Sequence, residues 1–323
     1  MGLLVEGTWK DEWYEADEDG RFVRPQTRFR SWVRADGSTP FAPEVGRYHL
    51  YVSLACPWAH RTLIMRALRG LEQAITVTVV DPKMGDNGWE IPGEGDGVDP
   101  IHGARFLHEV YTAARADYTG RVTVPVLWDR KEGTIVSNES RDILRMLDVE
   151  FTPIATRPVR YWSSALHDRI EETMDAIYEP INNGVYRAGF ATSQQAYEEA
   201  FSELFDALDH WDEVLGRQRY LCGDQLTEAD WCLFTTLVRF DPVYVGHFKC
   251  NLRRIADYPH LSGYLRELYQ VPGVAATVNL EHIRTHYYWS HPMINPTRIV
   301  PVGPALDLDA PHGRERVGGL RAS

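Results

Sequence analysis

The chain has 323 residues, of which 44% are hydrophobic and 25% charged, so it is long enough for two ordinary domains with full hydrophobic cores. Its formal net charge of -12 argues against nucleic acid or an anionic membrane surface as a general partner. No apolar run approaches the length of a transmembrane helix and the acidic start does not match a signal peptide, so we expect a soluble cytoplasmic protein.

Residues 1–45 carry scattered aromatic side chains among many charges. Turn signals occur at Asp36-Gly37 and at Pro40. We predict that this segment is an irregular arm that packs against a domain, and that it does not form a domain of its own.

The next hundred residues alternate between strand-like and helix-like patterns, which predicts the order βαβαββα. Strands are expected at residues 49–54, 74–82, 122–129 and 133–137, and helices at residues 57–70, near 108–118 and at 138–148. This order indicates a small mixed sheet with helices on its faces.

Cys56 lies between the first of these strands and a helix that opens with Pro57. At a helix N-terminus, free backbone N–H groups and the helix dipole favour a thiolate, so we expect a nucleophilic sulfur. The alternative is a buried structural cysteine. Because Ala59 occupies the third position after Cys56, no C-x-x-C disulfide is available, but a mixed disulfide resolved by an external thiol such as glutathione is possible.

Pro125 falls inside a segment that otherwise reads as a strand. A trans proline is normally excluded from a central strand, so one interpretation is an edge strand. The other is a cis Val124–Pro125 bond that turns the Val124 backbone outward, where it can pair with an extended peptide. The residues leave both open.

Glu139 and Ser140 begin the helix after the last strand, with Ser137 or Asn138 expected as its N-cap. An acidic residue in a first turn usually only complements the helix dipole. A helix N-terminus with a hydroxyl can also bind a carboxylate, and a neighbouring Glu can bind an ammonium group. Together they suit a zwitterionic α-amino-acid end, such as the γ-glutamyl end of glutathione.

From about residue 156 the patterns are helical, over residues 160–179, 193–215, 227–240 and 260–270. Thr227 and Asp230 approximate a capping box at the start of a buried helix. The remaining cysteines form no zinc-type spacing, so no metal site is expected. We assign Cys222 and Cys232 to the helical core, and favour a structural over a reactive role for Cys250.

Four tyrosines stand in polar, Gly-containing segments rather than on helix stripes: Tyr186, Tyr244, Tyr287 and Tyr288. Aromatic residues ordinarily serve packing, and the chain has 16 tyrosines. Their placement also fits the lining of a cavity. A phenol there can hydrogen-bond a quinol oxygen and help to protonate a ring carbon.

Several motifs carry a resemblance to a known family. CPWAHR, VTVPVLWD and NESRDIL, in this order, resemble the thioredoxin-like domain of glutathione transferases, and CPWAH is similar to the cysteine-type branch. RVTVPVLWD, NNGVYRAGFA, RFDPVYVGHFKCN and HYYWSHPMINPTRIVPVGP resemble the glutathionyl-hydroquinone reductases, the Xi class of that superfamily. The resemblance covers roughly residues 5–305.

The resemblance implies an α/β thioredoxin-like N-terminal domain plus an all-α C-terminal domain, the glutathione transferase fold. With the patterns above, the expected segments are an arm at 1–45, a glutathione-binding domain at 46–150, a helical substrate domain at 156–290 and a tail at 291–323. A homodimer built through the helical domain is implied as well.

The resemblance also implies roles for individual residues. Cys56 would be the nucleophile that attacks the sulfur of a glutathionyl-hydroquinone, with glutathione as co-substrate and no metal. The residues expected to bind glutathione are Trp89, Arg121, the backbone of Val124, Glu139 and Ser140. Tyr186, Tyr244 and Tyr287 match the tyrosines of the aromatic pocket, with the choice between Tyr287 and Tyr288 open. Two alternatives are an Omega-like cysteine-type transferase or dehalogenase, and a non-catalytic binding protein.

Overall fold

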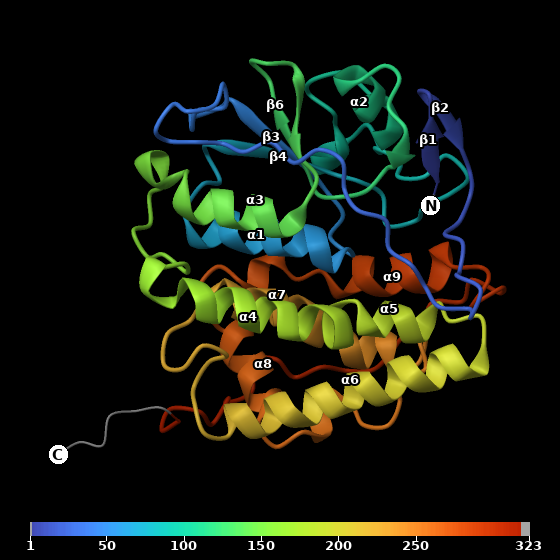
Figure 1. Ribbon diagram of the computed structural model, residues 1–323, viewed down its shortest axis with the longest axis vertical. Coiled ribbons are helices and arrows are strands. Elements are labelled where there is room, and N and C mark those ends of the chain that lie inside the picture. Colours follow the sequence, from blue (N-terminus) through green and yellow to red (C-terminus); the bar gives the residue numbers. More distant parts are fainter. Residues whose placement is uncertain (1, 318–323) are drawn as a thin grey trace. The chain divides into compact units, whose positions relative to one another are not determined.

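The computed structural model describes residues 2–317, and its elements are shown in Figure 1. The contacts divide the chain into two compact units, each of which contains segments distant in sequence. Within the described residues, one unit, here called the sheet unit, comprises residues 2–13, 24–159 and 276–300. The other, the helical unit, comprises residues 14–23, 160–275 and 301–317. The last six residues of the predicted tail lie outside the described part of the chain.

A four-stranded mixed sheet forms the centre of the sheet unit, in the order β4-β3-β6-β7. Its strands are β3 (Tyr48–Val52), β4 (Ile75–Val79), β6 (Val126–Asp129) and β7 (Thr134–Ser137). β3 pairs parallel to β4 and antiparallel to β6, and β6 pairs antiparallel to β7. The parallel pair follows from the helix that connects its strands, whereas β6 and β7 are joined by a short turn.

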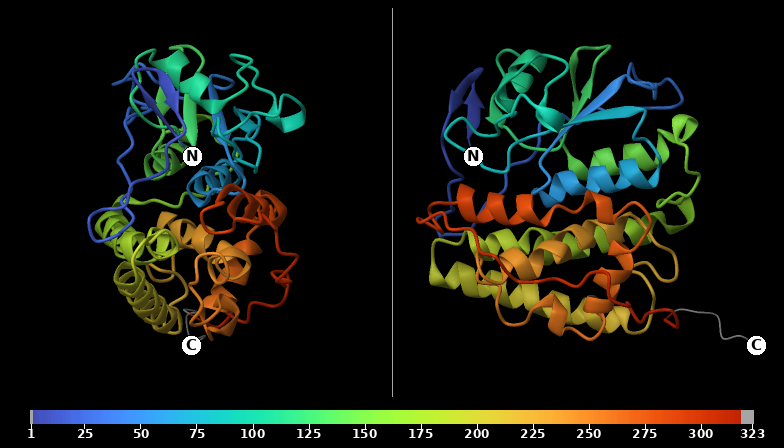
Figure 2. Two further views of the ribbon diagram at one scale, coloured as in Figure 1. Left: turned by 90° about the vertical axis from the view of Figure 1, so that its right-hand side faces the viewer. Right: turned by 180° about the vertical axis from the view of Figure 1, so that it is seen from behind.

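The helices of this unit are α1 (Pro57–Leu68), α2 (Leu107–Ala114), α3 (Ser140–Val149) and α9 (Leu280–Ser290). α1 and α3 lie side by side on one face of the sheet (Figures 1 and 2). Apart from a short 3-10 segment and a two-residue strand that belongs to a second sheet, the chain order is β3-α1-β4-α2-β6-β7-α3, which confirms the predicted βαβαββα pattern. α9 was not predicted as a helix, and residues 276–300 cluster with the sheet unit.

The N-terminal arm contains more regular structure than the sequence suggested. β1 (Leu3–Val5) and β2 (Thr8–Lys10) form a hairpin, and β1 also pairs antiparallel with β5 (Gly120–Arg121). The prediction of a wholly irregular arm was therefore wrong for its first ten residues. The hairpin depends on pairing with a strand more than a hundred residues away, which leaves little local signal.

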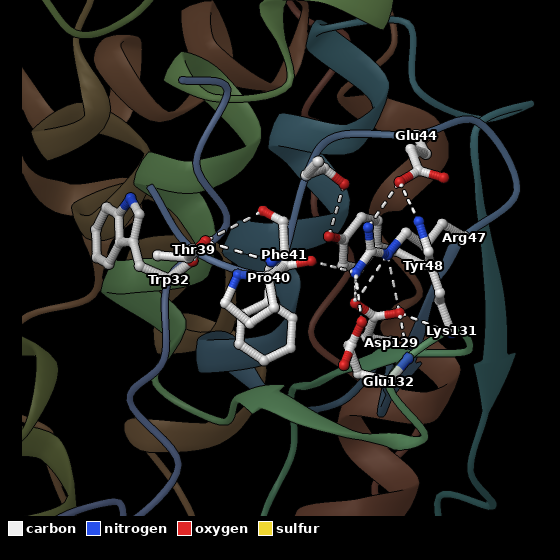
Figure 3. A network of polar contacts seen from close by, with 11 residues as sticks. Trp32, Thr39, Pro40, Phe41, Glu44, Arg47, Tyr48, Asp129, Lys131 and Glu132 are labelled. Atoms are coloured by element: carbon white, nitrogen blue, oxygen red, sulfur yellow. Dashed lines mark hydrogen bonds and ion pairs between the residues drawn. The ribbon is translucent and has the colours of Figure 1, made fainter. Parts of the chain in front are cut away.

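A buried ion pair attaches the later part of the arm to the sheet (Figure 3). The Arg47 guanidinium donates to both carboxylate oxygens of Asp129, with Nη2 2.6 Å from Oδ2, and also to Glu44 and to the Pro40 carbonyl. The Tyr48 hydroxyl donates to the Ala42 carbonyl at 2.8 Å. These bonds hold the segment before β3 against the turn between β6 and β7.

The helical unit contains α4 (His167–Ile177), α5 (Gly184–Gly189), α6 (Gln194–Leu215), α7 (Glu228–Arg239) and α8 (Leu261–Tyr269). The π-helical segments η4 (Tyr178–Asn182) and η5 (Phe240–Tyr244) follow α4 and α7. In the described part of the chain, the 3-10 segments are η1 (Gly95–Gly97), η2 (Thr152–Ile154), η3 (Ser164–Leu166), η6 (Ile255–Asp257) and η7 (Ala275–Thr277). α5 packs beside α6 (Figure 2).

The start of α7 confirms the predicted capping box. Asp230 accepts the Thr227 N–H at 2.7 Å and, with its second oxygen, the Leu221 N–H at 2.9 Å. Tyr264 donates to the same carboxylate from α8. Within residues 2–317, no helix is both long enough and apolar enough to cross a membrane.

Candidate functional site

Cys56 is the N-cap residue of α1, and Pro57 is the first helical residue. The prediction that its sulfur lies at a helix N-terminus is therefore confirmed. The thiol makes no capping bond with the helix, is partly exposed, and lies 3.7 Å from the Val124 carbonyl oxygen. The first turn of α1 thus keeps N–H groups that can stabilise negative charge on the sulfur.

Val124 is the residue that meets the thiol, and its backbone is available for pairing. The Val124–Pro125 bond is cis. β6 begins at Val126 and lies between β3 and β7, so Pro125 precedes a central strand and the edge-strand interpretation was wrong. Among residues 2–317, neither the N–H nor the C=O of Val124 takes part in a backbone–backbone hydrogen bond. An extended peptide beside Cys56 can supply both partners.

Glu139 is the N-cap of α3, in place of the expected Ser137 or Asn138. Ser137 ends β7, and its hydroxyl accepts the Glu139 N–H at 3.1 Å. The Glu139 carboxylate accepts the Arg141 N–H at 3.2 Å and the Thr27 hydroxyl at 3.1 Å. A carboxylate offers about four acceptor positions, so these two bonds leave capacity for an ammonium group.

Ser140 is the first residue of α3 and is 3% exposed. Its backbone N–H has no intrahelical acceptor because of this position. Its hydroxyl oxygen accepts a hydrogen bond from Arg61 Nη1 at 3.3 Å. Glu139 and Ser140 therefore offer an acceptor and two donors at adjacent positions, the arrangement that an α-amino-acid zwitterion requires.

Trp89 and Arg121, two of the residues predicted to bind glutathione, make contacts within the sheet unit. Trp89 is buried and stacks on His286 of α9, with ring centroids 4.7 Å apart. Among the described residues, its indole N–H has no hydrogen-bond acceptor. Arg121 donates to the backbone carbonyls of Glu12 and Trp13, the latter at 2.8 Å, and so holds the arm beside β5.

The tyrosines are divided between the two units. Tyr186 and Tyr244 belong to the helical unit, where their ring centroids lie 6.2 Å apart and both rings pack on Phe248. Tyr287 belongs to the sheet unit and contacts His286 and His291 edge-on. All three tyrosines are less than 9% exposed, whereas Tyr288 is partly exposed. Each unit thus contributes tyrosines of the predicted set.

Arg61 and Trp58 are site neighbours that the sequence prediction missed. The Arg61 guanidinium lies 4.4 Å from the Trp58 ring centroid, and the Arg24 guanidinium lies 5.0 Å from the same ring. Trp58 and Arg61 are three apart on one helix, a spacing that brings side chains together and was visible in CPWAHR. The hydrogen bond between Arg61 and Ser140, which lies on another helix, could not be predicted from any sequence pattern.

The other thiols are buried, which fits their expected structural roles. Burial raises the pKa of Cys222, and it raises that of Cys250 well above the usual range despite the neighbouring Lys249 charge. A pocket of about 330 Å³ in the sheet unit is lined by residues other than those predicted for the site: Leu54, Val79, Val80, Asp81, Pro82, Pro92, Gly97, Asn279 and His282. Within residues 2–317, no three His, Cys, Asp or Glu side chains are grouped to hold a metal ion.

Comparisons with known proteins show what the chain is similar to. Residues 55–150 match the family description "Glutathione S-transferase, N-terminal domain", and residues 194–267 match "Glutathione S-transferase, C-terminal domain". The chain is 53% identical to glutathionyl-hydroquinone reductase YqjG of Escherichia coli, over 98% of this chain and 99% of that protein. It is also 53% identical to glutathionyl-hydroquinone reductase PcpF of Sphingobium chlorophenolicum, over 95% and 98%.

A solved structure supports the same relationship. The glutathione-bound structure of YqjG from Escherichia coli superposes with a TM-score of 0.89 at 51% identity, covering 98% of this chain and 99% of that one. The similarity includes both units of the fold.

Proposed function

We propose that this chain, which belongs to the glutathione S-transferase family and within it to the glutathionyl-hydroquinone reductases, reduces glutathionyl-hydroquinones to hydroquinones with glutathione. One observation carries the chemistry. The Cys56 thiol lies at the N-terminus of α1, 3.7 Å from a Val124 carbonyl that lacks a backbone partner among the described residues. A peptide that pairs with Val124 would present its own sulfur beside Cys56.

In the first step, the Cys56 thiolate attacks the glutathione sulfur of the aryl thioether. A sulfur–sulfur bond forms and the bond between sulfur and the ring carbon breaks. The electron pair of that bond stays on the ring carbon, which takes up a proton. The ring is thereby reduced to the hydroquinone, and Cys56 is oxidised to a mixed disulfide with glutathione.

In the second step, the thiolate of another glutathione attacks the mixed disulfide. Oxidised glutathione forms and the Cys56 thiolate leaves, ready for the next cycle. The net reaction converts one glutathionyl-hydroquinone and one glutathione into one hydroquinone and one oxidised glutathione. All atoms and electrons are supplied by the two substrates.

The remaining predicted residues would hold the substrates for this chemistry. Glu139 would bind the γ-glutamyl ammonium group and Ser140 its carboxylate, while the Val124 backbone pairs with the cysteinyl part. Trp89 and Arg121 would complete the glutathione site. Tyr186, Tyr244 and Tyr287 would bind the quinol oxygens and assist protonation of the ring carbon.

We propose the cytoplasm as the compartment and a homodimer as the assembly. The four cysteines are free, and a glutathione-dependent cycle needs a reducing thiol pool. The homodimer follows from the family resemblance, and sedimentation equilibrium would measure it directly. A monomer at all tested concentrations would contradict it.

Product analysis tests the proposed reaction. Incubation with glutathione and a glutathionylated hydroquinone should yield hydroquinone and oxidised glutathione in a one-to-one ratio. A small glutathione mixed disulfide and dehydroascorbate serve as comparison substrates. Faster turnover of these than of the quinol thioether would instead support an Omega-like transferase, and turnover of none would support a binding protein.

A further inference from the structure

We propose that Arg61 is a positioning residue that aims the Ser140 hydroxyl at the γ-glutamyl carboxylate of glutathione. The inference rests on the glutathione site proposed above, but not on the hydroquinone reaction. It begins from the 3.3 Å hydrogen bond between Arg61 Nη1 and Ser140 Oγ, which joins α1 to the first residue of α3.

The direction of that bond decides where the hydroxyl hydrogen points. A guanidinium has donors only, so the Ser140 oxygen must accept from Arg61. The hydroxyl hydrogen is then left to donate elsewhere. Together with the Ser140 backbone N–H, which has no intrahelical acceptor, it forms a pair of donors at the start of α3. A carboxylate oxygen is the acceptor that such a pair favours.

Arg61 is held in place by its surroundings. Its guanidinium lies 4.4 Å from the Trp58 ring centroid, and Arg24 lies over the same ring at 5.0 Å. Arg61 is 3% exposed, as is Ser140, so little water screens the charge. A buried cation directly behind the hydroxyl adds attraction for an anionic ligand and polarises the O–H bond.

Two acidic residues at the start of α3 have partners of their own. The Glu139 carboxylate accepts the Arg141 N–H and the Thr27 hydroxyl, and Asp142 forms an ion pair with Arg30. Through its bond to Ser140, Arg61 lies on the Ser140 side of the zwitterion site, whereas Glu139 supplies the opposite charge one residue earlier. The site is thus polarised to match an ammonium and a carboxylate on one α-carbon.

Calorimetric titration with S-methylglutathione, which cannot form a mixed disulfide, tests the proposal in the full chain. Arg61→Met should weaken binding about tenfold, the size expected for loss of a charge-assisted hydrogen bond. The second probe is the same peptide without the γ-glutamyl carboxylate. Because that peptide offers no carboxylate to Ser140, its affinity should change less than twofold.

Three further variants separate positioning from folding. Arg66→Met removes another arginine of α1, one that bonds the Ile75 and Glu72 carbonyls, and should leave both affinities unchanged. In a Ser140→Ala background, Arg61→Met should cause no further loss, because the two side chains act through one bond. Arg61→Lys keeps the charge and provides an intermediate affinity if Arg61→Met folds poorly.

Equal weakening of both peptides by Arg61→Met, or independent losses in the double variant, would overturn the proposal. If S-methylglutathione binds as described but no hydroquinone forms, the proposed reaction fails while the role of Arg61 stands.

Discussion

Cys56 is the residue on which the proposed chemistry depends most directly. Cys56→Ala should abolish hydroquinone formation, because only this thiol forms the covalent intermediate, while S-methylglutathione binding persists through Val124, Glu139 and Ser140. Cys56→Ser should be nearly as inactive, since a serine hydroxyl is scarcely ionised at neutral pH. Steady-state assays and calorimetry measure the two properties.

Cys250→Ala provides the matched control for this thiol. Cys250 is fully buried and its pKa is raised by burial, so its removal should leave turnover within about twofold. Retention of a tenth of normal activity by Cys56→Ala, or a large loss in Cys250→Ala, would show that the wrong cysteine has been chosen.

The three tyrosines separate the specific reaction from a generic thiol transfer. If Tyr186, Tyr244 or Tyr287 protonates the ring carbon, its change to Phe should slow turnover of a glutathionyl-hydroquinone about a hundredfold. Loss of a neutral hydrogen bond alone should cost only several-fold. A small glutathione mixed disulfide, whose leaving group needs no carbon protonation, should be reduced at the normal rate by all three variants.

Tyr288→Phe is the control within the same helix, because Tyr288 adjoins Tyr287 and is partly exposed. It should behave like the unmodified chain with both substrates. Small and equal effects of all the changes on both substrates would mean that Tyr186, Tyr244 and Tyr287, which are buried, serve only packing.

At the scale of elements, β3 contains a buried titratable group, His49, that contacts β4. His49 is fully buried, with its ring nitrogens 2.6 Å from Thr76 Oγ1 and 2.9 Å from Thr78 Oγ1. Burial, together with the nearby Arg130 charge, lowers the pKa of His49 to about 4. In the unfolded chain a histidine has a pKa of about 6.5.

This difference predicts a dependence of stability on pH. Between about pH 6.5 and about 4, the unfolded chain binds a proton at His49 that the folded chain does not, so the free energy of unfolding falls as the pH falls. The contribution of His49 to this fall approaches about 1.4 kcal/mol per pH unit inside that window and vanishes above it. The free energy of unfolding, measured with urea at several pH values, should fall less steeply with falling pH for His49→Gln than for the unmodified chain. The same pH dependence in both would contradict the assignment.

The second prediction at this scale concerns the contribution of the Arg47–Asp129 ion pair to stability. Arg47→Met leaves the Asp129 carboxylate buried, with only the Lys131 and Glu132 N–H groups of the turn as remaining donors among the residues of Figure 3. Removing one partner of a buried pair costs about 3 kcal/mol or more. Thermal unfolding should therefore shift downward, and adding Asp129→Asn should recover part of the loss. No recovery would mean that lost packing explains the effect.

Elements fixed by local sequence were predictable. Pro57 and the apolar spacing after it placed the start of α1 correctly, and Thr227 with Asp230 placed that of α7. The prediction of Ser137 or Asn138 as the N-cap of α3 was wrong. It relied on the general preference for Ser and Asn at this position, whereas here Ser137 belongs to β7 and Glu139 is the N-cap.

Features decided by distant contacts were not predictable in this way. The arm hairpin forms against β5, and α9 packs in the sheet unit although it follows the helical segments in sequence. The contact between Arg61 and Ser140 joins two helices whose partnership no periodicity reveals. The sequence left two interpretations of Pro125 open, a cis Val124–Pro125 bond and an edge strand. The bond is cis, and the central position of β6 rules out the edge strand.

At the scale of the whole molecule, the proposed glutathione residues Trp89, Arg121, Val124, Glu139 and Ser140 all belong to the sheet unit. A ligand that binds only the folded state stabilises it by mass action, by about 2.7 kcal/mol at a hundred times its dissociation constant. S-methylglutathione should therefore raise the unfolding temperature of that unit by roughly 5–10 °C.

Scanning calorimetry measures this shift and identifies the unit in which it occurs. If the two units unfold in separate transitions, the one that Arg47→Met lowers belongs to the sheet unit, and S-methylglutathione should raise that same transition. Cys56→Ala should keep the shift, because binding does not require the thiol, whereas Glu139→Gln should reduce it by removing the charge that binds the ammonium group. A shift confined to the other transition would contradict the proposed glutathione site, since it would place the ligand on the helical unit.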